Sequence, residues 1–417
     1  MKSAVVAVLL GISLLWASDR PKRPDILIIT NANVVDVRYG TVLPNATIVI
    51  KNGEIDAIAK FAVLDTGPNV HVVNAGGGYV IPGLWDMDAH FSQATAPGWD
   101  NHSLFSDYLA NGVIGLREPG NGDDRIQLVS GIKERGPHDP LGEILPYLHS
   151  ALPAHGLAEQ RTIEGVDEVM LACSSKEDEL RHKPAPAPQP EWEAPPEPVG
   201  RQIRASYDPQ KAESLFLSVS NHGTWMVPTL VSLEAPFAQF SGDDWESVTD
   251  PFTIKWSQSQ IAELVEEKSK FERARLLVHD MRSSGVQFLA GTGGPRKELP
   301  PGRSLHRELK LLVSSGFSPL DAIRTATINA ALYIAKLNKY GVVETGHVAD
   351  LVLTDGNPAE DINNLEKITG VVMNGNYFSR ADLDRFSGPG RDSAQHTKTA
   401  AVPVAKPAQQ SGVRHQD

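Results

Sequence analysis

The stretch Val80-Ile81-Pro82-Gly83-Leu84-Trp85-Asp86-Met87-Asp88-Ala89-His90-Phe91 joins an apolar run to the polar pattern Asp88-Ala89-His90. It closes a β-rich segment and opens the central part of the chain. A buried strand that ends in acidic and histidine side chains is typical of an α/β barrel, because the active-site groups of such barrels lie at the carboxyl ends of their strands. We therefore expect the rest of the chain to be arranged around Asp88 and His90.

Length and composition indicate an enzyme-sized globular protein that binds small molecules. The chain has 417 residues, 41% of them hydrophobic, which is enough to bury one large core and a smaller one. The net charge of -12 argues against a nucleic-acid or anionic-membrane surface, so we expect neither nucleic-acid binding nor stable membrane insertion. Cys173 is the one cysteine in the sequence, which excludes an intramolecular disulfide and a multi-thiolate zinc site.

The N-terminus has the pattern of a signal peptide. Met1-Lys2 form a charged region, and the apolar run from Ala4 to Trp16 is shorter than a typical membrane span. We predict a signal peptide over residues 1–18 and export to a bacterial periplasm or the extracellular space. An uncleaved tether is the alternative.

Both ends of the remaining chain have β-strand patterns. β-branched residues recur over 26–29, 33–37 and 46–58, and again over 351–354 and 370–376. An Asn-Gly pair lies in each set, and Asn-Gly between two such runs is the strongest short signal for a hairpin. We expect antiparallel strands in both segments.

The middle of the chain alternates helical and strand patterns, as in an α/β fold. The clearest βα unit is a helix over 104–112 with a glycine C-cap, followed by a buried strand over 113–117. Further strands are expected at 225–230 and 286–292, and further helices near 125–135 and over 166–181, 253–284 and 319–337.

Two segments lie outside this pattern. Residues 183–199 are rich in proline and predict an extended surface insertion, either a plain spacer or a ligand for a proline-binding partner. Residues 387–417 are polar and poor in large apolar side chains, so we predict a disordered tail.

Several motifs resemble those of the amidohydrolase superfamily, in its imidazolonepropionase-like and prolidase-like branch. The opening stretch resembles the Pro-Gly-Leu-x-Asp-x-His-x-His signature, and Gly112-Val113-Ile114-Gly115-Leu116-Arg117-Glu118 resembles Gly-Val-Thr-Thr-Val-Arg-Asp of the second barrel strand. Residues 304–309, 326–331 and 346–353 resemble the closing segments of the family. The order of these motifs makes the resemblance specific.

The resemblance implies an α/β fold in two parts. A TIM-like (β/α)8 barrel would span residues 81–339, and residues 24–80 plus 340–385 would form a small composite β-sandwich beside it. A barrel of about 250 residues uses roughly 31 for each βα unit, so the ends of strands one and six should lie roughly 155 residues apart. The corresponding positions, His90 and Leu171, are about 80 residues apart, which predicts that about two units are missing or shortened.

The resemblance also implies a zinc-dependent site, because members of this family bind metal through histidines, often with a carboxylated lysine. His90 and His155 match two of these histidines, and Asp88 stands where the signature has its first histidine. A carboxylate can bind zinc, so we predict Asp88, His90 and His155 as metal ligands. Leu171 matches the histidine that ends the sixth strand, and Gly293 matches the aspartate that accepts a proton, so both of these roles lack a side-chain donor.

Two functions follow from these matches. The resemblance implies hydrolysis of carbon–nitrogen bonds, such as those of cyclic amides or dipeptides, with activity impaired because a ligand and the proton acceptor are replaced. The alternative is a catalytically silent relative that binds a small ligand or a partner. His306 either contacts substrate, as its motif implies, or packs on its own helix, and Glu118 either serves the site or has a structural role.

Overall fold

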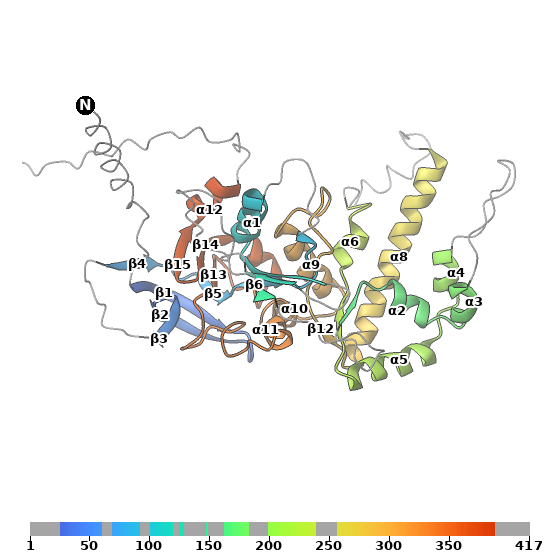
Figure 1. Ribbon diagram of the computed structural model, residues 1–417, viewed down its shortest axis with the longest axis horizontal. Helices are drawn as coiled ribbons and strands as arrows, with labels where there is room; N and C mark the ends of the chain where they lie inside the picture. The colour runs from blue at the N-terminus through green and yellow to red at the C-terminus, as the bar shows by residue number, and fades with distance from the viewer. Residues whose placement is uncertain are drawn as a thin grey trace, which may run out of the picture.

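The computed structural model describes residues 26–60, 69–91, 101–119, 125–128, 147–148, 162–182, 199–238 and 257–387. Figure 1 shows a β-rich region at one end of the molecule, a helical region at the other end, and a mixed region between them. The predicted signal peptide, residues 183–198 of the proline-rich segment, His155 and residues 388–417 lie outside the described residues.

The β-rich region, called the β module below, combines the two terminal segments. Its strands are β1 (Ile26–Asp36), β2 (Thr41–Lys51), β3 (Glu54–Ala59), β4 (Val70–Asn74), β5 (Tyr79–Pro82), β13 (Leu351–Thr354), β14 (Ile368–Met373) and β15 (Asn376–Ser379). They form one sheet in the order β15-β14-β13-β5-β1-β2-β3, with β4 also paired to β1. Because β5 pairs with β1 on one side and with β13 on the other, the prediction that the terminal segments join is confirmed.

Two Asn-Gly turns set the register of the hairpins in the β module. Asn52 and Gly53 have φ values of 53° and 86°, and Asn374 and Gly375 have 48° and 75°. Positive φ at both central residues is the requirement of a type I′ turn, whose twist matches that of the flanking strands. The sequence therefore predicted both hairpins from local signals.

The mixed region contains five short parallel strands. These are β6 (Leu84–Asp86), β7 (Val113–Glu118), β10 (Thr162–Glu164), β11 (Trp225–Val227) and β12 (Gln287–Phe288). β6 pairs with β7, and β11 pairs with β10 and β12. The two sets meet where the Met87 N–H donates to Ala290 O at 2.8 Å and where Ala89 bridges Gly294 in parallel. Their carboxyl ends therefore lie along one edge.

Beyond β7 the sheet turns antiparallel. β8 (Arg125–Leu128) pairs with β7, and β9 (Tyr147–Leu148) pairs with β8. The prediction of a helix near 125–135 is wrong for 125–128, where the apolar residues Ile126 and Leu128 alternate with polar ones at the strand period of two. The described ranges do not contain a complete eight-stranded barrel.

Helices cover the mixed region and form the far end of the molecule. They are α1 (Asn101–Ala110), α2 (Asp167–Ala172), α3 (Glu177–Arg181), α4 (Val199–Ala205), α5 (Pro209–Asn221), α6 (Leu230–Glu234), α8 (Gln258–Ser283), α9 (Arg303–Ser314), α10 (Pro319–Thr325), α11 (Ile328–Tyr333), η3 (Ile362–Glu366) and α12 (Arg380–Ser387). The helices predicted over 166–181 and 319–337 are each two helices. No helix in the described ranges is long and apolar enough to cross a membrane.

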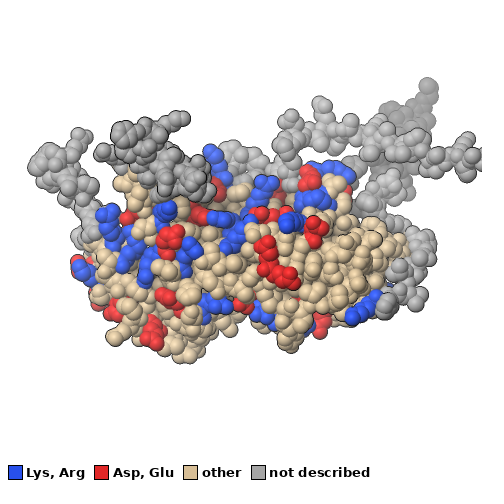
Figure 2. Space-filling view, turned by 180° about the vertical axis from the view of Figure 1, so that it is seen from behind, with Lys and Arg blue, Asp and Glu red and all other residues tan. Residues whose placement is uncertain are grey.

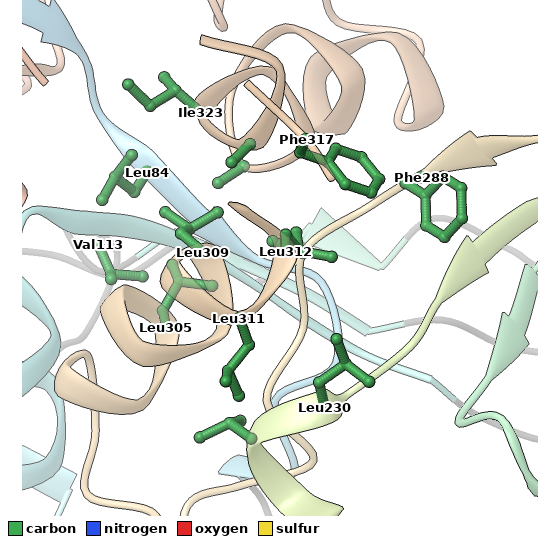
Figure 3. Packing of buried hydrophobic residues seen from close by; sticks show 14 of the residues in the cluster. Leu84, Val113, Leu230, Phe288, Leu305, Leu309, Leu311, Leu312, Phe317 and Ile323 are labelled. Atoms are coloured by element: carbon green, nitrogen blue, oxygen red, sulfur yellow. The ribbon is translucent and has the colours of Figure 1, made fainter. Parts of the chain in front are cut away.

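Helix α9 packs into the centre of the mixed region. Leu305, Leu309 and Leu312 are fully buried in the same core cluster as Leu84 of β6 and Val113 of β7. Figure 3 shows these side chains gathered around α9. Burying a leucine side chain contributes about 1.5–3 kcal/mol, so this face holds the helix firmly against the strands.

Acidic and basic side chains are interspersed over the face of the molecule shown in Figure 2. Among the described residues, several acidic and basic side chains are ion-paired between elements, for example Lys270 of α8 with Asp167 of α2 at 2.8 Å. Such exposed pairs contribute at most about 1 kcal/mol each. This face therefore has charges of mixed sign.

Candidate active site

Asp88 and His90 lie just beyond the carboxyl end of β6, held by backbone hydrogen bonds from both sides. The Ala89 N–H donates to Arg117 O at 2.8 Å, which ties this segment to β7. On the other side the Gly293 N–H donates to Asp88 O at 2.8 Å, and the His90 N–H donates to Gly294 O at 2.5 Å. The side chains of Asp88 and His90 are therefore carried on rigid backbone.

The two side chains face each other and leave polar atoms without hydrogen bonds. Asp88 Oδ1 lies 3.3 Å from His90 Nε2, and the Asp88 side chain is 5% exposed whereas that of His90 is 37% exposed. Among the described residues, Asp88 Oδ1 and His90 Nδ1 have no hydrogen-bond partner, although both atoms are buried. Because buried polar atoms are nearly always hydrogen-bonded, this pair is placed to receive a ligand or water.

Burial raises the pKa of the Asp88 carboxyl to about 6. The charges of His90 and Arg117 act against this shift, and the charge of Glu164 adds to it. Desolvation disfavours the charged form of a carboxyl, whereas a nearby cation favours it. Asp88 therefore titrates in the range in which a small change in its surroundings alters its charge.

Asp86 supports this site from the buried side of the strand. Its carboxylate accepts hydrogen bonds from the Thr292 N–H at 3.0 Å, from the Thr292 hydroxyl at 2.7 Å and from the Asp88 N–H at 3.2 Å. Complete burial raises the pKa of Asp86 to about 7, and the hydrogen bonds from Thr292 oppose that shift. Asp86 thus links the strand that carries Asp88 to the segment that follows β12.

Arg117 and Glu164 form an ion pair at the ends of two other strands. The Arg117 guanidinium, at the end of β7, is 1% exposed and lies 2.9 Å from Glu164 Oε1 and 2.9 Å from the Thr162 hydroxyl. It also donates to Met87 O at 2.8 Å and lies over the ring of Tyr333. A buried cation thus stabilises the carboxylates at this edge.

Arg117 and Glu164 are not among the site residues predicted from the sequence. Arg117 stood within a quoted motif, yet nothing in the sequence gave it a partner. Glu164 follows Thr162-Ile163, and a strand of three residues is too short for a periodic pattern. The signal that could have found Glu164 is a carboxylate immediately before the glycine of Gly165-Val166-Asp167.

Gly293 lies directly beside Asp88. A Cβ atom at this position would be 3.9 Å from Asp88 Oδ2 and 2.7 Å from Ser232 Oγ, and the φ angle of Gly293 is +64°. The match of Gly293 to the family's proton-accepting aspartate is therefore spatially consistent. Because the site lacks a carboxylate here, a side chain could fit only if Ser232 moved.

The match of Leu171 to a strand-ending histidine is wrong. Leu171 lies within helix α2, whereas the neighbouring parallel strand β10 ends at Glu164. The run Asp167-Glu168-Val169-Met170 forms a helix because Val169 and Met170 are buried while Asp167 and Glu168 lie in its first turn, where acidic side chains are stabilising. The residue that ends the strand is thus Glu164.

Of the two further predicted histidines, His155 lies outside the described residues and His306 is buried in α9. The His306 Nε2–H donates to Asn111 O at 2.9 Å, which joins α9 to the end of α1. Burial lowers the pKa of His306 to about 4. This environment suits a neutral histidine that packs between two helices. The contact with substrate stays a prediction.

Asp88 and His90 are the two predicted metal ligands that lie within the described residues. Within the ranges that the structure describes, no group of three or more His, Cys, Asp or Glu side chains could hold a metal ion. Catalytic zinc sites have three protein ligands, and Asp88 with His90 makes two. The predicted set of Asp88, His90 and His155 therefore needs a donor that lies outside these ranges.

Comparison with known proteins finds a family model and a relative that are similar to this chain. A model of the amidohydrolase family matches residues 220–377. An adenine deaminase of Rubrobacter xylanophilus is 25% identical over 411 residues, covering 90% of this chain and 61% of the deaminase. The chain thus spans less than two thirds of that relative.

Solved structures share the fold. A Xaa-Pro dipeptidase with bound methionine has a TM-score of 0.51 at 17% identity, covering 85% of this chain and 100% of the dipeptidase. A bottromycin amidohydrolase has a TM-score of 0.53 at 14% identity, covering 88% and 89%. An ochratoxinase of A. niger has a TM-score of 0.50 at 17% identity, covering 85% and 96%. Residues 220–377 thus match the amidohydrolase family, and the fold of the chain is similar to that of these solved structures.

Proposed function

We propose that this chain is a hydrolase that acts on the carbon–nitrogen bonds of small molecules, with reduced activity. The observation that carries the proposal is the pair Asp88 and His90, which faces the carboxyl edge of the parallel strands with two buried polar atoms free of hydrogen bonds. The family match supports the reaction class. We further propose that the parallel strands belong to a barrel of the amidohydrolase type, and that the β module is its composite sandwich.

The chemistry assigned to the residues follows from their contacts. Asp88 Oδ1 lies 3.3 Å from His90 Nε2 on one side of the imidazole, which leaves Nδ1 on the other side to bind a ligand. Arg117 compensates the carboxylates of Asp88 and Glu164. A zinc ion, when bound, supplies a water with a pKa near 7. Asp88 and His90 would be two of its ligands, and we propose His155 as the third.

Reduced activity follows from Gly293. In a family site the residue at this position accepts a proton during attack on the carbonyl group, and general base catalysis contributes about 10²–10⁴-fold. Glycine has no such group. The same position favours the second candidate function, a catalytically silent relative that binds a ligand at Asp88 and His90.

The test combines metal content with turnover. The full chain is chelated, reloaded with zinc and analysed for zinc per chain, and then assayed on dipeptides, N-acyl amino acids, cyclic amides and adenine. The variants Asp88→Asn and His90→Asn should lose most of the zinc and the activity, whereas His222→Asn, at the exposed end of α5, should lose neither. Unchanged turnover in Asp88→Asn would refute the proposed site. Ligand binding without turnover of any substrate would establish the silent alternative.

A further inference from the structure

Glu308 is a buried acid that the proposed chemistry does not use. It lies on the inner face of α9 and is 0% exposed. Its Oε2 accepts a hydrogen bond of 2.7 Å from the Val231 N–H at the start of α6, whereas its Oε1, also buried, has no hydrogen-bond partner among the described residues. Figure 3 shows Leu230 of α6 and Leu311 of α9 among the buried hydrophobic residues of the same region.

A carboxyl group is energetically unfavourable at this buried position. The same helix carries the buried side chains of Leu305, Leu309 and Leu312, and burying a polar group without a full set of hydrogen bonds is unfavourable. Burial also raises the pKa of Glu308 to about 8. A well-packed apolar side chain would be at least as stable, so Glu308 has a role besides packing.

The role is visible in the hydrogen bonds that lead away from Val231. The next residue, Ser232, donates its hydroxyl to Thr292 O at 2.8 Å. Thr292 in turn donates both its N–H and its hydroxyl to Asp86, which accepts the Asp88 N–H. A continuous series of hydrogen bonds thus connects α9, through α6 and the segment after β12, to the backbone of Asp88.

We infer that Glu308 is a positioning residue, which fixes the start of α6 so that Ser232 holds Thr292 against Asp86 and thereby sets the position of Asp88. Glu308 acts through the other residues of this series and does not touch the site itself. The effect on turnover rests on the proposed function. The effect on the order of the segment after β12 does not depend on the proposed function.

Hydrogen exchange, read by mass spectrometry on peptides covering 226–235 and 287–294, tests the inference directly. Glu308→Leu removes the acceptor and leaves the Val231 N–H unpaired, so exchange in both peptides should become at least about tenfold faster. Glu308→Gln keeps an acceptor oxygen of the same size, and its exchange should stay within about twofold of the parent chain. Leu309→Ala, on the same face of α9, is the control for a general loss of stability.

The outcomes separate cleanly. Faster exchange at 287–294 in Glu308→Leu, with little change in Glu308→Gln and in Leu309→Ala, supports the inference. Equal acceleration in Glu308→Leu and Leu309→Ala, or none in Glu308→Leu, overturns it. Should Glu308→Leu fail to fold, Ser232→Ala breaks the next hydrogen bond of the series and must loosen 287–294 for the inference to hold.

Activity gives an independent measurement. In a chain that turns over substrate, Glu308→Leu should lower kcat more than it raises KM, because Asp88 is displaced without loss of the binding surface, and Glu308→Gln should restore kcat. If the parent chain hydrolyses nothing, the proposed function fails while the exchange result still decides whether Glu308 positions the segment. The two failures are therefore distinguishable.

Discussion

The core of the β module and the strand-end site bury different kinds of side chain. The core cluster of the β module consists of aliphatic side chains, among them Ile29, Ile48 and Ile50. The site buries Asp86, Asp88 and Arg117 at the ends of neighbouring strands. The pKa values of both aspartates are raised, and the charge of Arg117 compensates that of Asp88. The difference teaches that the core of the β module is stabilised by the burial of aliphatic side chains, whereas the site holds charges whose free energy depends on pH and on one another.

Removing the buried cation should have the largest effect. Arg117→Met leaves Glu164 and Asp88 without their counter-charge, and breaking a buried ion pair costs about 3–5 kcal/mol of unfolding free energy. The loss should be smaller at about pH 5 than at about pH 8, because Asp88, with a pKa of about 6, is then protonated. Urea unfolding at the two pH values measures both effects.

The control for this prediction is the double variant Arg117→Met/Glu164→Gln. It removes both charges of the pair, so it should recover part of the lost stability. A loss that is equal at both pH values would show that Arg117 stabilises the fold through its packing on Tyr333 instead of through its charge.

A truncation in the β module should cost somewhat less and should not depend on pH. Ile48→Ala removes a fully buried side chain from β2, which costs about 2–4 kcal/mol through lost burial and a cavity. The loss in urea unfolding should be the same at about pH 5 and about pH 8, because the surrounding cluster is aliphatic. A pH-dependent loss would contradict the contrast between the two regions.

Adding a carboxylate to the site should be destabilising and should not raise turnover. In Gly293→Asp the φ angle of +64° strains the backbone, the new Cβ meets Ser232 Oγ, and the new charge lies near Asp88, together about 2 kcal/mol. Gly293→Asn is the matched control, because asparagine tolerates this conformation and is neutral. Hydrolysis by Gly293→Asp at a level above the parent chain would refute this prediction.

At Glu308 the expected effect is a change in the pH dependence of stability and not a loss at every pH. Its folded pKa of about 8 lies above the ordinary value of 4.5, so its contribution to stability is fully present below about pH 4.5 and is lost as the pH rises through about 8. Glu308→Gln should flatten this decline, because an amide does not titrate. Thermal unfolding of both proteins between about pH 5 and pH 8.5 measures it, and parallel curves would contradict the burial of a titrating carboxyl.

The sequence predicted the β module better than the site, for a physical reason. Its hairpins depend on Asn52-Gly53 and Asn374-Gly375, whose backbone preferences act locally. The pairing of Arg117 with Glu164 joins strand ends that are distant in sequence, and β10 is too short to show a period. The match of Leu171 is wrong for the same reason. The family's histidine ends a strand, and the sequence does not show that β10 ends at Glu164.

The order of the sheet also constrains how the chain is made. β5 lies between β1 and β13, and β13 follows β5 by roughly 270 residues. At about 5–20 residues per second of synthesis, β5 waits on the order of half a minute on the ribosome with one edge unpaired. Such an edge is a template for pairing with another chain. We therefore expect the unpaired edge of β5 to be open to pairing with other chains until β13 has been made.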